Sequence, residues 1–126
     1  MDAWAIFDRA VASHRQGDLA QAESLYRNLL GAYPDHGVVN HLMGLLRAQQ
    51  ERFDEAVPFY ETSLRTKPGD PAVLLDAGNT FQKLKRYDEA LRSFEAALAA
   101  HPGYFEAINN RGNVFLELEQ LERAHL

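Results

Sequence analysis

Apolar residues recur every three or four positions along most of the chain, the spacing that places side chains on one face of an α-helix. One such face contains Ala22, Leu25, Tyr26, Leu29 and Leu30. Short breaks separate the apolar segments. Residues 17–19 read Gly-Asp-Leu, and prolines follow several segments at positions where a proline can no longer continue a helix. The pattern predicts an all-α chain of short amphipathic helices.

Seven helices are predicted, with approximate bounds 2–16, 20–31, 37–50, 54–66, 71–84, 88–100 and 105–119. An eighth helix is expected to begin at Leu121, and the sequence stops at Leu126. The fifth helix has the clearest start. Asp70 is a good N-cap, and Pro71 has the backbone dihedral angle that is favoured in a first helical turn.

The same pattern returns with a period of 34 residues. Four series of residues keep this spacing: Pro34, Pro68 and Pro102; Gly44, Gly78 and Gly112; Ala22, Ala56, Ala90 and Ala124; and Tyr26, Tyr60 and Phe94. Such a period predicts an array of helix-turn-helix repeats, in which each repeat buries its apolar face on its neighbours. We expect one array over residues 1–126, with repeats at about 3–36, 37–70 and 71–104 and a partial repeat at 105–126 that is cut from a longer array.

Small residues at fixed places predict where the helices of one repeat cross closely. We expect Gly44 to face Ala56, Gly78 to face Ala90, and Gly112 to face Ala124, because larger side chains would push the helices apart. The aromatic series at Tyr26, Tyr60 and Phe94 is expected to fill the space between one repeat and the next.

The pattern resembles the tetratricopeptide repeat family. The residues that carry the resemblance are the motifs FDEA at 53–56 and YDEA at 87–90, together with Gly78, Phe81, Tyr87, Ala90, Phe94, Ala97 and Pro102. The resemblance implies an α-solenoid, a right-handed superhelix of antiparallel helix pairs in which the first helix of each pair lines a concave groove. Members of the family mostly bind other proteins as scaffolds, adaptors or targeting modules.

Charge and composition narrow the range of partners. The formal net charge of −5 argues against a protein that binds a nucleic-acid backbone, which needs a concentrated basic face. Cysteine is absent, so disulfides, thiolate metal sites and thiol nucleophiles are excluded, and a reducing compartment is favoured. No leader and no apolar run of about 18 residues are present. We therefore expect a cytoplasmic protein that binds neither nucleic acid nor membrane.

No residue pattern indicates catalysis. The five histidines (His14, His36, His41, His101 and His125) form no HExxH motif and no pair spaced by four residues. A G-x-S-x-G motif and a glycine-rich phosphate loop are also missing. Acidic residues such as Asp88 and Glu89 lie at helix starts, where they complement the helix dipole. The sequence predicts no catalytic residue, no metal and no cofactor.

The resemblance implies which residues project into the groove. They are Trp4, Phe7, Val11, His14, Arg15, His41, Leu45, Ala48, Gln49, Leu75, Asp76, Asn79, Gln82, Lys83, Glu106, Asn109, Asn110, Asn113 and Glu117. Within this set, the candidate ligand-binding residues are Trp4, Phe7, His41, Leu45, Gln49, Asn79, Gln82, Lys83, Asn109, Asn110 and Asn113.

The groove changes in character from apolar at Trp4 and Phe7 to amide-rich at Asn109, Asn110 and Asn113. Asparagine both donates and accepts hydrogen bonds, which suits the backbone of an extended peptide. A similar asparagine series lines the repeat domain of the sugar-transferring members of the family. The alternative is that these asparagines only solvate an open face.

Family members that grip the C-terminal carboxylate of chaperones use Lys, Asn and Arg at five positions. The matching residues here are Phe7, Val11, Leu42, Ala72 and Asp76, so the resemblance argues against a carboxylate-gripping co-chaperone.

Three functions remain open from the sequence. The first is a protein-interaction module that binds a partner segment in its groove and has no catalysis of its own. The second is the amino-terminal, substrate-recruiting arm of a larger enzyme such as a glycosyltransferase. The third is a self-assembling array, with homo-oligomers formed through the uncapped C-terminal repeat.

Overall fold

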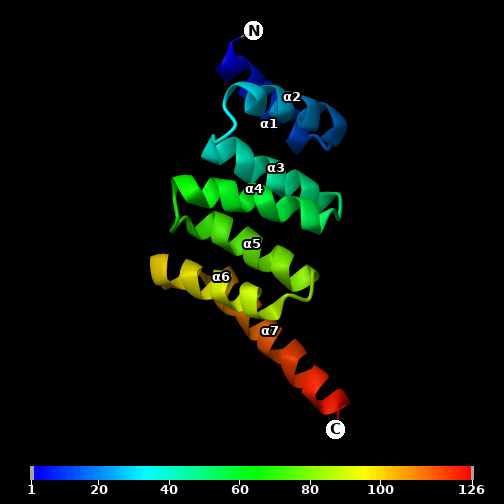
Figure 1. Cartoon of the computed structure of the whole chain (residues 1–126), viewed down its shortest axis with the longest axis vertical. Coiled ribbons are helices and arrows are strands. Elements are labelled where there is room, and N and C mark those ends of the chain that lie inside the picture. The colour runs from blue at the N-terminus through cyan, green and yellow to red at the C-terminus, as the bar shows by residue number, and fades with distance from the viewer. Residues whose placement is uncertain (1, 126) are drawn as a thin grey trace. The chain divides into compact units, whose positions relative to one another are not determined.

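The computed structural model describes residues 2–125, and over this range the chain forms seven α-helices and no strand (Figure 1). The helices are α1 (Ala3–Arg15), α2 (Leu19–Ala32), α3 (Gly37–Gln49), α4 (Phe53–Thr66), α5 (Pro71–Lys83), α6 (Tyr87–Ala100) and α7 (Phe105–Ala124). The helices α1, α3, α5 and α7 begin at intervals of 34 residues, which is the period of the sequence pattern.

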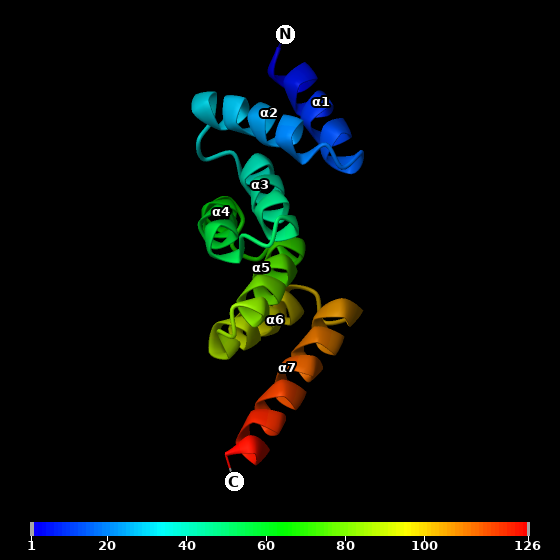
Figure 2. The same ribbon diagram turned by 90° about the vertical axis from the view of Figure 1, so that its right-hand side faces the viewer.

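The helices gather into two compact units, Met1–Thr66 and Lys67–Leu126. In the N-terminal unit, α1 packs against α2, α2 against α3, and α3 against α4. In the C-terminal unit, α6 packs against both α5 and α7, and α5 also contacts α7 (Figure 2). The N-terminal unit thus contains the first and second repeats, α1 to α4. The C-terminal unit contains the third repeat, α5 and α6, together with α7.

Aspartates begin three of the helices as N-caps. The side chains of Asp2, Asp18 and Asp70 accept hydrogen bonds from the backbone N–H groups of Ala5, Gln21 and Ala72, at 2.8, 3.2 and 3.1 Å. Each carboxylate satisfies a backbone donor that has no partner within the helix, which fixes where the helix starts.

At the close helix crossings of the second and third repeats, an aromatic ring is the nearest neighbour of the glycine. A Cβ atom added to Gly44 would lie 2.6 Å from the ring of Tyr60, and one added to Gly78 would lie 2.5 Å from the ring of Phe94. Each glycine therefore receives the aromatic ring of its own repeat, one turn after the alanine. The rings are fully buried at these crossings, and Tyr26, the first residue of the aromatic series, lies in a buried cluster with Val39, Met43 and Leu46 of the next repeat.

The turn inside each helix pair contains one residue with a positive φ. These residues are Gly17 at 83°, Glu51 at 60° and Lys85 at 62°, and they follow one another at 34-residue spacing. Left-handed backbone costs a residue other than glycine about 1–2 kcal/mol. At Glu51 and Lys85 the packing of the following helix offsets this cost.

The expected second helix of the last repeat, beginning at Leu121, is not formed. The next position in the turn series is Glu119, which lies inside the single continuous helix α7. No helix packs back on this part of α7 in the described chain, so nothing offsets the cost of a left-handed residue there. The expected pairing of Gly112 with Ala124 was consequently wrong. Leu126 lies outside the described residues.

None of the helices within residues 2–125 combines the length and the apolar character that crossing a membrane requires.

Candidate binding surfaces

An apolar pocket opens in the N-terminal unit, where the beginnings of α1 and α3 meet the end of α2. Its volume is about 520 Å³, and its lining residues are Ala3, Trp4, Phe7, Leu29, Tyr33, His36, Val38 and Val39. Apart from His36 and the phenol of Tyr33, these side chains are apolar. A pocket of this size accommodates a large aliphatic or aromatic side chain.

Two predicted residues, Trp4 and Phe7, form one wall of this pocket. Their rings meet edge to face, with centroids 6.5 Å apart. Trp4 is 77% exposed, although a tryptophan of a folded domain is usually buried to a large extent. The pocket is therefore bordered by an aromatic surface that no part of the described chain covers.

The opposite wall contains residues that the sequence analysis missed. Val38 and Tyr33 are both more than half exposed, and Val38 follows Trp4 by one 34-residue period. The repeat register could have identified Val38 as the partner of Trp4. The loop that carries Tyr33 and His36 is held by the buried Asn40, whose Nδ2 donates to the backbone oxygens of Pro34 and His36 at 3.0 and 2.8 Å.

The other predicted residues of the N-terminal unit lie outside the pocket. His41 is half-buried with its ring edge-on to that of Tyr60, and Leu45 is half-buried. Gln49 is exposed and tied to His14, whose Nε2 donates to Gln49 Oε1 at 2.6 Å. In the neutral ring, His14 Nδ1 then accepts from the hydroxyl of Tyr26 at 2.8 Å.

This chain of hydrogen bonds joins α1 to α2 and α3. Burial raises the pKa of Tyr26 to about 12, so the phenol keeps its proton at all ordinary pH values. The arrangement positions α3 relative to α1.

In the C-terminal unit, a polar face links α5 to α7. Asn110 Nδ2 donates to Asn79 Oδ1 at 2.7 Å, and Gln82 Nε2 donates to Glu117 Oε1 at 2.6 Å. Glu117 Oε2 also accepts from the hydroxyl of Tyr87 at 3.0 Å. The structure thus brings together three predicted residues, Asn79, Gln82 and Asn110, along one side of the unit.

Glu117 is the centre of this network. Hydrogen bonding from Gln82 is the main cause that holds the pKa of Glu117 below its usual value, with smaller contributions from Tyr87 and Lys85. The ammonium of Lys85 lies 3.7 Å from Glu117 Oε2. Glu117 therefore stays ionised at neutral pH and acts as an acceptor within the unit.

Lys83, Asn109 and Asn113 are exposed at the surface of α5 and α7. Leu75 is different. It was expected to project into the groove, but only 5% of it is exposed because α5 is covered by its neighbours α6 and α7.

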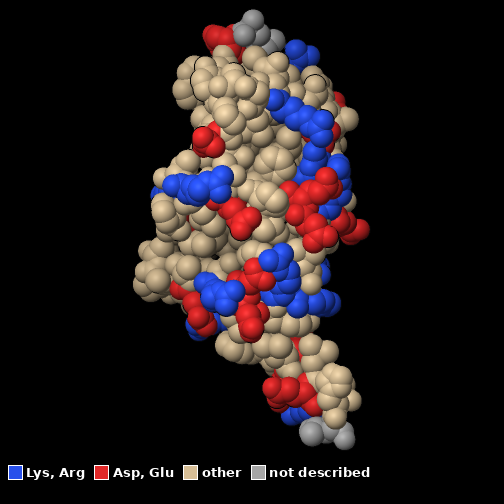
Figure 3. Space-filling model, viewed as in Figure 1, with Lys and Arg blue, Asp and Glu red and all other residues tan. Residues whose placement is uncertain are grey.

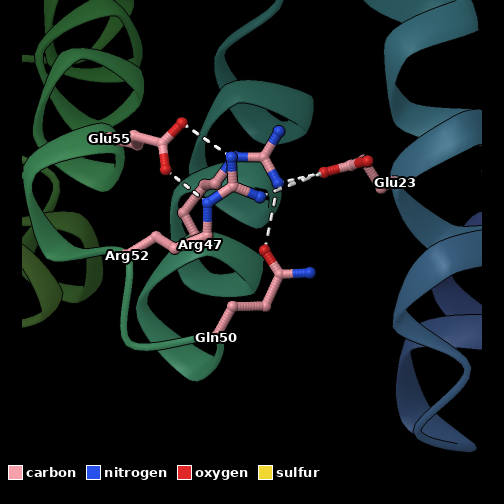
Figure 4. Close-up of polar contacts among 5 residues, drawn as sticks. All are labelled: Glu23, Arg47, Gln50, Arg52 and Glu55. Carbon is pink, nitrogen blue, oxygen red and sulfur yellow. Dashed lines mark hydrogen bonds and ion pairs between the residues drawn. The ribbon is translucent and has the colours of Figure 1, made fainter.

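A buried charge cluster, also missed from the sequence, connects the first repeat to the second (Figure 4). The guanidinium of Arg47 on α3 pairs with Glu23 on α2 and donates to Gln50 Oε1 at 3.0 Å. The side chain of Arg47 is 4% exposed and that of Glu23 is 24% exposed. The hydrogen bond from Arg47 is the main cause that lowers the pKa of Glu23.

Arg52 and Glu55 extend this cluster to the surface. Arg52 Nη2 donates to Glu55 Oε1 at 2.8 Å, and Arg52 Nη1 lies 3.9 Å from Glu23 Oε1. The cluster joins α2, α3 and α4, so we assign it a structural role.

Across the residues that the structure describes, three or more His, Cys, Asp or Glu side chains nowhere come together as a possible metal site. On the face drawn in Figure 3, acidic side chains lie among the basic ones.

A tetratricopeptide repeat model matches residues 13–75 and 47–92, and a second tetratricopeptide repeat model matches residues 75–124. The chain belongs to the tetratricopeptide repeat family. No match to a curated protein was found.

Solved structures share the fold of this tetratricopeptide repeat protein. MamA MSR-1 is 23% identical with a TM-score of 0.85, over 98% of this chain and 71% of that chain. The first TPR of Spaghetti (RPAP3), bound to the HSP90 peptide SRMEEVD, is 19% identical with a TM-score of 0.88, over 93% of both chains. The Sgt2 TPR domain from Aspergillus fumigatus is 13% identical with a TM-score of 0.87, over 96% of this chain and 82% of that chain.

The predicted fold class, an all-α solenoid of helix-turn-helix repeats, is therefore confirmed. At these identities the likeness shows the fold and assigns no ligand.

Proposed function

We propose that this tetratricopeptide repeat protein is a protein-interaction module that binds an extended segment of a partner protein and has no catalysis of its own. The observation that carries the proposal is the open apolar pocket beside Trp4 and Phe7. Ligand pockets typically have volumes of about 300–1,000 Å³ and apolar linings with a few polar groups. A large apolar side chain of the partner segment would fill the pocket and cover the exposed ring of Trp4.

The polar face of the C-terminal unit supports a second contribution to binding. Asn109 and Asn113 are exposed, and each offers one acceptor and two donors to a peptide backbone. The side chains of Asn79 and Asn110 are already oriented by their mutual hydrogen bond. Less rotamer entropy is lost when such preorganised groups bind.

The class of function agrees with that of a protein of the same fold, since the first TPR of Spaghetti (RPAP3) is bound to a peptide of HSP90. The mode of recognition proposed here is different. An apolar pocket selects a partner by a buried side chain and not by a terminal carboxylate.

A displayed library of unstructured peptides, selected against the purified chain, tests this proposal. We expect the selected peptides to share a large aliphatic or aromatic residue. Val38→Asp should weaken their binding at least tenfold, because it places a charge in the pocket wall at an exposed position. Leu121→Asp is the matched control, since Leu121 is exposed on α7 of the other unit.

The contribution of the polar face is tested with a triple variant, Asn79→Ala, Asn110→Ala and Asn113→Ala. We expect it to bind the same peptides more weakly while its circular dichroism spectrum is unchanged. If both Val38→Asp and the triple variant bound the selected peptides as tightly as the parent, the proposed function would be abandoned.

A further inference from the structure

Helix α7 carries a stripe of apolar side chains that the rest of the chain leaves exposed. Phe105, Ile108, Phe115 and Leu116 are spaced by three, seven and one residues, so they lie on one side of the helix. Ala107 and Val114 are buried on another side, where α7 packs within the C-terminal unit. The exposed stripe is therefore a second apolar surface of α7.

A glycine lies in the middle of this stripe. A Cβ atom added to Gly112 would meet no atom within 4 Å, whereas one at Gly44 or Gly78 would run into the ring of Tyr60 or Phe94. The three glycines have the same position in their repeats. In the two earlier repeats the glycine forms a notch for an aromatic ring of an antiparallel helix, and at Gly112 the notch is open.

Helix α7 itself provides a ring that fits such a notch. Phe115 follows Gly112 by three residues and lies on the same stripe, half exposed. When two copies of α7 lie antiparallel about a two-fold axis, Phe115 of each copy faces Gly112 of the other. This repeats between two chains the contact that Phe94 makes with Gly78 within one chain.

We propose that this surface binds a second copy of the chain, in an antiparallel α7–α7 pair with Phe115 of each copy seated over Gly112 of the other. A two-fold contact of this kind is closed, so it yields a dimer and not a filament. Glu119, the next residue along the stripe, is paired with Arg123 at 2.7 Å. The end of the stripe therefore brings no unpaired charge into the contact.

The size of the stripe sets the strength of the pair. An aromatic side chain offers about 150–250 Å², so Phe105 and Phe115, which are 75% and 51% exposed, present roughly 250 Å² together. With Ile108 and Leu116 the stripe reaches roughly 400 Å² per copy, or roughly 800 Å² for the pair, below the range of stable specific interfaces. We therefore expect a dimer that dissociates at micromolar concentrations.

Sedimentation equilibrium across a dilution series of the 126-residue chain tests this inference. We expect a reversible monomer–dimer equilibrium, and Gly112→Ala should weaken dimerisation at least tenfold because the added methyl fills the notch. The same substitution should not lower the melting temperature at concentrations where the chain is monomeric. A Cβ at position 112 meets nothing within the chain, and alanine favours a helix more than glycine does.

Leu121→Ala is the matched control. Leu121 is exposed on α7 but lies on the side away from the stripe, so its removal should leave the dimerisation constant unchanged. Three results would overturn the inference: a chain that stays monomeric at high concentration, open polymers that grow with concentration, or a dimer that Gly112→Ala does not weaken.

Discussion

The buried ion pair between Glu23 and Arg47 gives the sharpest prediction about stability. Replacing Glu23 by valine removes the carboxylate and leaves the guanidinium of Arg47 nearly enclosed, with Gln50 as its remaining partner within the cluster. Removing one partner of a buried pair typically costs about 3–5 kcal/mol, because the other charge is left without compensation. Glu23 is 24% exposed, so water can partly replace it and we expect about 3 kcal/mol.

The repeat register offers a matched rescue of this variant. One period later in the sequence, the positions of Glu23 and Arg47 are occupied by Val57 and Phe81. Replacing a buried ion pair by apolar residues is often neutral or stabilising. The double variant Glu23→Val with Arg47→Phe should therefore regain most of the loss and unfold within about 1 kcal/mol of the parent.

Urea denaturation followed by circular dichroism measures these free energies of unfolding. The parent, Glu23→Val, Arg47→Phe and the double variant form a double-mutant cycle. Glu55→Val is the control, because Glu55 and Arg52 are exposed and their pairing should not affect the denaturation midpoint. The reasoning would be refuted if Glu23→Val alone unfolded at the same urea concentration as the parent. It would also be refuted if the double variant were as unstable as the single one.

Three further predictions concern the crossings, the turns and the pH dependence. Ala90→Leu should cost about 1–3 kcal/mol by overpacking the crossing beside Phe94, and an unchanged melting temperature would show that α5 and α6 do not meet there. Lys85→Gly should stabilise the chain by up to about 1 kcal/mol, because the φ of Lys85 is 62° and glycine adopts this conformation without strain. Gly17→Ala should destabilise the chain, because alanine at the φ of Gly17 is strained. Thermal melts in which both substitutions shifted the melting temperature in the same direction would contradict this account. The pKa values of Glu23 and Glu117 are lowered in the folded chain, so their contribution to stability is complete above the ordinary pKa of 4.5 and is lost as the pH falls through the lowered values. Glu117→Gln should therefore reduce the fall in melting temperature on acidification below about pH 4.5, and an unchanged acid profile would show that Glu117 is not stabilised by Gln82 and Tyr87.

The helices could be predicted from the sequence because a repeat array contains the same pattern of residues several times. The small residues, the aromatic residues and the helix starts each recur at one period, so an error at one repeat is corrected by the others. The first six helices consequently begin and end within one residue of the predicted bounds, whereas α7 continues past its predicted end to Ala124. Asp70 and Pro71 begin α5 as their cap chemistry predicts.

The sequence predictions were wrong or incomplete where one repeat differs from its neighbours. Glu119 has the register of a turn residue, but a turn there depends on a following helix that packs back, and the described chain has none. Arg47 was missed because an arginine at a position held by phenylalanine in later repeats has no repeated signal. Its partner Glu23 lies on another helix, and only packing brings the two together.

The candidate site was predicted in part. The family resemblance assigned to a groove the residues Trp4, Phe7, Asn79, Gln82 and Asn110. In the structure Trp4 and Phe7 line the pocket, and Asn79, Gln82 and Asn110 lie on one side of the C-terminal unit. The resemblance did not indicate the depth of the pocket, which depends on the end of α2 and on the loop held by Asn40. It also could not show that Leu75 is covered by neighbouring helices.

The central claim, that the apolar pocket holds a side chain of a partner segment, is tested most directly by the fluorescence of Trp4. Trp4 is the only tryptophan of the chain and its ring is largely exposed at the pocket wall. Titration with a tryptophan-free peptide selected from the displayed library should shift the emission of Trp4 to shorter wavelength and saturate with the same Kd as calorimetry. The shift should be lost with Val38→Asp and retained with Leu121→Asp. A peptide that binds by calorimetry but leaves the emission of Trp4 unchanged would contradict the account.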